Sequence, residues 1–262
     1  MRHVLKVYQR KRKIEDEAHD NGARSLGSCA TLLAEGGMTR KQIATHILEL
    51  AGLLVVGMLV SWVPLAEAIG CGDTLIGPAA FKLDSDLTCD VSPALTLTNG
   101  AKLDMNHHTV TCDTATVGIQ INDAGSDLKN GGVTRCTTAG VVVDGTGGHH
   151  VKGVTSWGNG GDGFQITSEN NVLENSAGNN NGGDGVQVSG DGNVLNVNTA
   201  TGNTGDGVRV ADGATNNRIT KNIATGNSAT YDLEDENAGG TCDTNFWAKN
   251  TFSTSNPSGC IH

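Results

Sequence analysis

The hydrophobic pattern in the second half of the chain repeats with a period of about 22 residues. Gly163, Gly185 and Gly207 each open a phrase that continues with an apolar, a polar and a second apolar residue. The same register extends backwards to Gly140 and Gly118. A fixed period of this size is typical of a stacking unit that cannot bury its own apolar face alone.

Within each phrase the apolar residues alternate with polar ones, which predicts a short strand with one face turned inward. The alternating pairs are Ile119/Ile121, Val141/Val143, Phe164/Ile166, Val186/Val188 and Val208/Val210. A second apolar position follows in each repeat, at Leu128, Val151, Val172, Val194 and Ile219. A repeat of about 22 residues has room for roughly three short strands and three turns. The pattern therefore predicts an all-β, right-handed parallel β-helix of about seven or eight rungs.

Asparagines recur with the same period and favour this architecture. One series is Asn159, Asn181, Asn203 and Asn227, and a second is Asn171, Asn193 and Asn217. Stacked amides can bond along a ladder, and asparagine tolerates the left-handed backbone of sharp turns. Leucine-rich repeats share the period but need regular leucines that are missing here. Calcium-binding nonapeptide repeats need a much shorter period, and the Gly-Gly-Asp-Gly runs recur only once in each repeat.

On these phrases, and on the closing run from Tyr231 to Phe252, the chain resembles the right-handed parallel β-helix proteins of the pectate-lyase-like superfamily. The resemblance covers about Cys71 to His262. It implies the fold, and it implies relatives among polysaccharide lyases, alginate epimerases and carbohydrate-binding proteins. The shared phrases concern stacking, so they assign no catalytic residue.

The N-terminal part has the composition of a leader. The apolar run from Leu50 to Val60 follows basic residues and precedes an Ala-Glu-Ala sequence, which predicts a secretory signal over 38–68 with cleavage before Ile69. A retained membrane anchor is the alternative, although the run is short for a membrane span. Residues 1–37 are expected to be a disordered extension or to precede the true start at Met38. The domain is expected over 69–262, with no membrane contact after cleavage.

Cysteines support export to an oxidising compartment. Residues 69–262 hold an even set of six, which favours disulfides. Fifteen pairings are open, and we predict the local ones: Cys71–Cys89, Cys112–Cys136 and Cys242–Cys260. A zinc site is the rival, but no Cys-x-x-Cys sequence occurs. Lipidation of Cys71 is a further alternative, but it would leave an odd number of cysteines to form disulfides.

The charge of residues 69–262 limits the partners. Nine basic and 21 acidic residues give a formal charge of −12. Such a surface repels nucleic acid, and it repels polyuronates unless a cation bridges the two. A secreted, periplasmic or cell-surface protein with a polysaccharide partner is expected.

Two columns of residues are candidate binding sites if the first strands stack. The outward positions should form a glycan-binding stripe of Gln120, Val142, Gln165, Gln187, Arg209 and Asp232. Amides suit sugar hydroxyls and Arg209 suits a carboxylate, although any solvated strand has polar outward residues. Stacked Asp162, Asp184 and Asp206 could hold Ca²⁺; turn chemistry with backbone N–H partners is the alternative.

No catalytic residue can be assigned. The paired His107-His108 and His149-His150 are expected to be exposed turn residues rather than bases or metal ligands. The Asp-Pro-His-Asp run of the alginate epimerases and any Asp-Asp dipeptide are absent. The sequence therefore favours a carbohydrate-binding or structural surface module. The alternatives are a lyase, epimerase or glycoside hydrolase acting along the first sheet, and, last, an ice-binding protein, for which the sequence has no regular Thr-x-Thr array.

Overall fold

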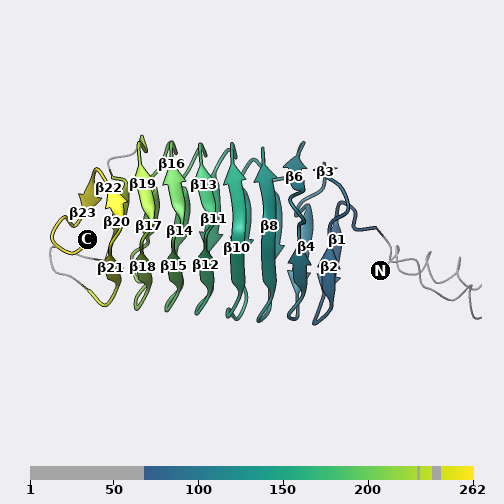
Figure 1. The fold of residues 1–262 in the computed structure, drawn as a ribbon, viewed down its shortest axis with the longest axis horizontal. Helices are drawn as coiled ribbons and strands as arrows, with labels where there is room; N and C mark the ends of the chain where they lie inside the picture. The colour runs from purple at the N-terminus through teal and green to yellow at the C-terminus, as the bar shows by residue number, and fades with distance from the viewer. Residues whose placement is uncertain (1–67, 229–230, 238–242) are drawn as a thin grey trace, which may run out of the picture. The chain divides into compact units, whose positions relative to one another are not determined.

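A computed structural model describes residues 68–228, 231–237 and 243–262. The predicted extension over 1–37 and nearly all of the predicted signal peptide lie outside these residues. The described chain winds into a parallel β-solenoid, as predicted (Figure 1). Among the described residues there is no helix that could span a membrane.

The first sheet contains nine parallel strands, one from each successive rung and one from the C-terminal end. They are β1 (Asp73–Ile76), β4 (Leu95–Thr98), β7 (Val117–Ile121), β9 (Ala139–Val143), β11 (Asp162–Ile166), β14 (Val186–Val188), β17 (Val208–Val210), β20 (Leu233–Asp235) and β23 (Ser255–Asn256). This order in the sheet follows the order in the sequence, as expected of a solenoid.

The second sheet has two flanks joined by a bend, so each rung contributes about three strands. The β2 flank comprises β2 (Ala80–Lys82), β5 (Lys102–Asp104), the first halves of β8 (Asp127–Thr134) and β10 (His150–Trp157), β12 (Val172–Glu174), β15 (Val194–Asn196), β18 (Arg218–Thr220) and β21 (Phe246–Ala248). The β3 flank comprises β3 (Leu87–Cys89), β6 (Thr109–Cys112), the second halves of β8 and β10, β13 (Ala177–Asn179), β16 (Thr199–Thr201), β19 (Ile223–Thr225) and β22 (Thr251–Phe252).

The predicted stacking register is confirmed. Phe164 lies beside Val186, and Val186 lies beside Val208, in adjoining strands. In two rungs the prediction of the second apolar position was one residue off, because Val172 and Val194 are partly exposed and the residues after them lie inward instead. The inward column is Leu128, Val151, Leu173, Leu195 and Ile219. All of these side chains are buried, and full burial of such a side chain stabilises a fold by about 1.5–3 kcal/mol. The core is therefore a set of columns parallel to the solenoid axis.

Asparagine ladders line the corners, as predicted. Asn181 accepts the backbone N–H of Asn159 (3.1 Å) and its Nδ2–H (2.9 Å), and Asn203 does the same for Asn181. The second predicted series is also a ladder, in which Asn193 accepts from Asn171. A third ladder was not predicted: Asn198, Asn222 and Asn250 each accept the backbone N–H of the rung before.

From β8 onward, the bend between the two flanks places one residue of each rung in the left-handed region. Asn130, Gly153 and Asn175 occupy it with φ of 58°, 63° and 49°, and Val197 and Lys221 occupy it with φ of 59°. Glycine and asparagine tolerate this conformation, whereas a β-branched residue does so only under strain. Val197 is also 44% exposed, so its side chain gains little from packing.

Replacing Val197 with asparagine is therefore expected to raise the free energy of unfolding by about 1 kcal/mol. Reversible chemical denaturation followed by circular dichroism measures the change. Asn175→Val, at the equivalent position one rung earlier, should lower stability by a similar amount. Equal stability of all three proteins would show that the bend is not strained at residue 197.

Disulfides close the N-terminal rungs. The structure contains Cys71–Cys89 and Cys112–Cys136, which are two of the three pairs expected from the spacing. Cys89 lies beside Cys112 in adjoining strands, so the two bridges lie next to each other along the solenoid axis. Cys260 is disulfide-bonded, and Cys242, its predicted partner, lies outside the described residues.

Candidate functional site

The outward positions of the first sheet form one continuous row. Its members pair in register from strand to strand and are Gln120, Val142, Gln165, Gln187, Arg209 and Glu234. We call this set the amide row. All but one of its members carry a hydrogen-bonding side chain, and all six are partly exposed. Neighbouring strands lie about 4.8 Å apart, so adjacent side chains of the row can contact the same ligand.

The prediction that Asp232 belongs to this row is wrong. Leu233 pairs with Val208, so Glu234 is the residue beside Arg209. Asp232 is only 3% exposed and accepts the backbone N–H groups of Ser253 (2.8 Å) and Thr254 (3.2 Å). Burial would raise its pKa, but these hydrogen bonds outweigh that effect and lower it. The connection that leads to β20 is longer than the regular repeat. The residue that pairs with Arg209 therefore comes two positions later than predicted.

The aspartate series lies beside the amide row and is held by the backbone. Asp162 Oδ1 accepts the N–H of Asp184 (2.7 Å), and Asp184 Oδ1 accepts the N–H of Asp206 (2.8 Å). The aspartate oxygens thus have backbone N–H partners, which was the alternative to Ca²⁺ binding. Within the described ranges, no three His, Cys, Asp or Glu side chains gather as metal ligands. Ca²⁺ binding by these aspartates therefore stays a prediction.

Side-chain hydrogen bonds join the amide row to these aspartates. Gln165 Nε2 donates to Asp162 Oδ2 (2.8 Å). Gln187, with its amide oriented to suit both neighbours, donates to Asp162 Oδ2 (3.2 Å) and accepts from Arg209 Nη2 (2.8 Å). Three adjacent members of the row are thus fixed in one conformation.

Arg209 is the most strongly held member of the row. Its Nε donates to Asp184 Oδ2 (2.7 Å) and its Nη1 to Glu236 Oε1 (3.1 Å). Burial alone would lower the pKa of Arg209, but Asp184 and Glu236 raise it above its usual value. Its charge is compensated within the protein by these two carboxylates, so the row carries no uncompensated positive charge at this residue.

One carboxyl beside the row binds its proton unusually tightly. Burial raises the pKa of Asp206 to about 7, and hydrogen bonding with Glu234 and repulsion by Glu234 and Asp184 add to the shift. A group whose folded pKa exceeds its unfolded value, 3.8 here, stabilises the fold below that value. This contribution is lost as the pH rises through the folded pKa.

Asp206→Asn should therefore stabilise the protein at pH values above about 7 and have little effect near pH 4. The asparagine keeps an oxygen for the backbone N–H of Tyr231, which Asp206 accepts, and carries no charge. Thermal melts of the variant and the wild type, compared at each pH, measure the difference. Asp212→Asn, at an exposed residue, is the control and should show no such trend. A stability difference that is constant with pH would contradict the assignment.

The expectation that His149 is exposed is wrong. It is 1% exposed and takes the asparagine position of the second ladder one rung before Asn171, to which its backbone N–H donates. Its Nδ1 accepts the backbone N–H of Ser126 (3.1 Å), and its Nε2 lies 2.9 Å from the carbonyl oxygen of Asp144. Burial lowers its pKa, so the ring is neutral and structural.

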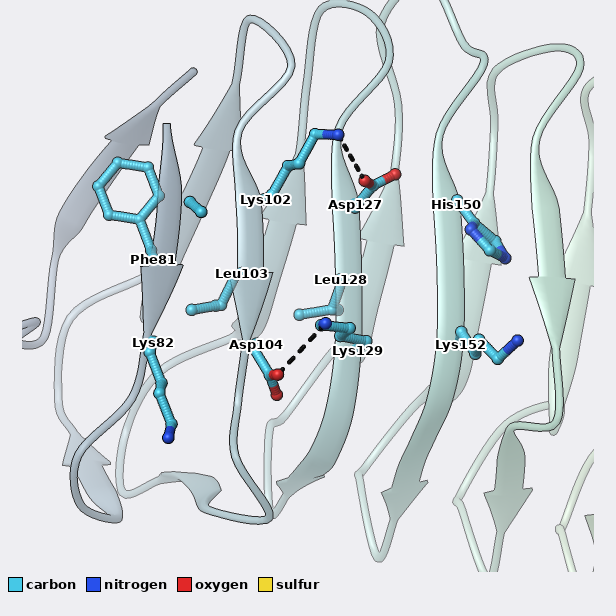
Figure 2. A pocket seen from close by; sticks show the side chains of 11 residues that line it. Phe81, Lys82, Lys102, Leu103, Asp104, Asp127, Leu128, Lys129, His150 and Lys152 are labelled. Atoms are coloured by element: carbon cyan, nitrogen blue, oxygen red, sulfur yellow. Dashed lines mark ion pairs between the residues drawn. The ribbon is translucent and has the colours of Figure 1, made fainter. Parts of the chain in front are cut away.

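A hollow of about 400 Å³ lies on the β2 flank, and sequence reasoning did not predict it. Figure 2 shows it along the outward rows of β2, β5, β8 and β10. Lys102 pairs with Asp127 (3.4 Å) and Lys129 with Asp104 (3.3 Å), and the lining also includes Lys82, His150 and Lys152. The lysines are unequally spaced in the sequence, because they belong to two neighbouring rows, so no single period points to them.

Comparison with known proteins agrees with the architecture. Residues 92–224 match the family described as a right handed beta helix region. No curated protein sequence matches the chain. Among solved structures, the A-module of mannuronan C-5 epimerase AlgE6 from Azotobacter vinelandii is similar, with 17% identity and a TM-score of 0.49 over 64% of this chain. The match spans 58% of that structure.

Proposed function

Because the chain belongs to the right-handed β-helix region family, we propose that it is an exported module that binds carbohydrate along its first sheet. The amide row is the observation that carries this proposal. Gln165 and Gln187 stand side by side in register, on strands whose inward side chains are fully packed. Export is supported by the predicted signal peptide and by the two N-terminal disulfides.

The chemistry of the row suits sugar hydroxyls. A primary amide has two donor hydrogens and an acceptor oxygen, so each glutamine can bond a hydroxyl while it keeps its bond to Asp162. Side chains already fixed in one conformation lose little entropy when a ligand binds. The charge of Arg209 is compensated by its carboxylate partners, which favours hydroxyl recognition over capture of a carboxylate at this point of the row.

A glycan-array screen of the purified exported protein tests the proposal. Gln165→Ala/Gln187→Ala is expected to lower affinity for the selected glycan about tenfold, since each lost hydrogen bond contributes about 0.5–1.5 kcal/mol. Asn196→Ala, at an outward amide on β15, is the matched control and should bind normally. Unchanged glycan binding by the double variant would overturn the placement of the carbohydrate-binding site on the first sheet.

An enzyme acting on the same face is the second candidate, favoured by the raised pKa of Asp206. A carboxyl that titrates near pH 7 can give and take a proton under physiological conditions, and it is hydrogen-bonded with Glu234, which pairs with Arg209 in the row. A lyase, epimerase or glycoside hydrolase needs such a group near the bond that it changes.

Product assays on a panel of polysaccharides separate the two candidates. Unsaturated uronate, new reducing ends or solvent deuterium in the sugar would each establish catalysis, by lyase, hydrolase or epimerase respectively. Loss of that product in Asp206→Asn would then assign the group. Absence of product with a glycan that binds tightly would leave the binding function.

A further inference from the structure

The hollow on the β2 flank differs in charge from the rest of the protein. It is lined by four lysines: Lys82, Lys102, Lys129 and Lys152. Residues 69–262 contain only nine basic side chains in all, so almost half of them face this one depression. The three carboxylates paired with these lysines are Asp104, Asp127 and Glu174.

The local charge is therefore opposite in sign to the remainder. Four lysines against three carboxylates give a formal +1, whereas the other charged residues of 69–262, five basic and 18 acidic, give a formal −13. An anionic chain is repelled over most of the surface and attracted here, because low-dielectric walls concentrate the field of a depression. A ligand of this hollow is therefore expected to carry negative charge.

The lysines are free to change partners. Lys102, Lys129 and Lys152 have side chains that are 56%, 51% and 52% exposed, and ion pairs at such positions contribute little to stability. Among the described residues, Lys82 has no ion-pair partner. Figure 2 shows its side chain on β2, the strand next to that of Asp104. A ligand carboxylate can take a lysine from its present partner at little cost.

The size of the hollow fits short stretches of a polymer. Its volume, about 400 Å³, lies within the range of small-ligand sites. The lysines come from four successive strands, so charges are spread along the solenoid axis at the strand spacing of about 4.8 Å. A chain with repeated charges can therefore contact several of them at once.

We propose that this hollow is a second binding site, separate from the amide row, for a carboxylated polysaccharide. The lysine side chains would bind successive carboxylates of the chain, and the ion pairs already present show that carboxylates fit between them. The site deepens the proposed carbohydrate-binding function, on which it rests for the class of polymer, but it uses different residues on a different sheet.

Binding of the exported protein to polygalacturonate, measured by biolayer interferometry, tests this inference. We expect binding at about 20 mM NaCl that weakens at least tenfold by about 200 mM, because salt screens exposed charges. The fully methyl-esterified polymer, which has lost its charge, should bind at least tenfold less tightly. The variant Lys82→Gln/Lys102→Gln/Lys129→Gln should lose at least tenfold in affinity, and the corresponding triple Lys→Arg variant should retain binding.

The control changes the net charge equally at a distance from the hollow. Arg135→Gln/Lys221→Gln/Lys249→Gln alters three exposed basic residues and should bind within twofold of the wild type. Equal losses in the two glutamine variants would overturn the site, as would equal binding of the methyl ester. Equal binding of the carboxylated chain and of a DNA strand would overturn the ligand class.

The first-sheet variant distinguishes this inference from the proposed function. If Gln165→Ala/Gln187→Ala abolishes polygalacturonate binding and the lysine variant does not, the hollow is excluded and the amide row supported. If only the lysine variant loses binding, the second site stands even where the amide row fails.

Discussion

Replacing Asn203 with alanine is expected to lower the free energy of unfolding by about 3 kcal/mol. Asn203 is fully buried. Its Oδ1 accepts the N–H of Asn181 (2.9 Å), and its Nδ2 donates to the carbonyl oxygen of Gly178 (2.9 Å) and to Asn227 Oδ1 (3.0 Å). Alanine leaves the buried N–H of Asn181 without an acceptor, and each orphaned buried group costs about 1–3 kcal/mol.

Chemical denaturation at fixed pH measures this loss. Asn196→Ala is the control, because Asn196 is a partly exposed outward amide on β15 whose side-chain oxygen accepts the Thr220 hydroxyl (3.2 Å), and it should cost less than about 1 kcal/mol. Similar losses in both variants would mean that the ladder adds nothing beyond an ordinary surface hydrogen bond.

Gly178→Ala is the second change with a large expected effect, at least about 3 kcal/mol of destabilisation. A Cβ at this position would lie 2.2 Å from the carbonyl oxygen of Gly185 and 2.8 Å from its carbonyl carbon. Both are backbone atoms of the neighbouring rung and cannot turn aside as a side chain can. The corner between the β3 flank and the first sheet would have to open.

Thermal unfolding and limited proteolysis measure the effect of Gly178→Ala. Gly259→Ala serves as the control, since a Cβ at Gly259 would meet nothing within 4 Å, and it should melt with the wild type. Wild-type stability of Gly178→Ala would show that the rungs can separate at this corner without cost.

The architecture was predictable because its determinants recur at one spacing. Phe164, Val186 and Val208 occupy the same place in successive repeats, and identical spacing in sequence becomes adjacency in space when every rung has the same length. The same reasoning located two of the three asparagine ladders. The third was not predicted, because serine rather than asparagine stands at Ser176, one rung before Asn198, and because Asn222 and Asn250 are 28 positions apart, where a longer turn interrupts the period.

The residues of the candidate surfaces were less predictable, because their positions depend on whether the rungs between them have the same length. Gln165, Gln187 and Arg209 were placed correctly in one row, since the rungs between them are regular. Asp232 was not, because the longer connection before β20 moves Glu234 into register with Arg209. The charged hollow depends on which of two outward rows each lysine occupies, which a single period does not reveal.

The direction of the asparagine hydrogen bonds makes the two ends of the solenoid unequal. In every ladder the peptide N–H of one turn donates to the amide oxygen of the next turn along the chain, as from Asn159 to Asn181 and from Asn198 to Asn222. Trimming whole turns from the C-terminal side removes acceptors and strands donors, which proteins rarely tolerate. Trimming from the other side strands oxygens in the asparagine ladders, a milder defect, and strands N–H donors in the shorter aspartate series, which runs in the opposite direction. Because the asparagine ladders are more numerous, shortened versions should retain the C-terminal turns.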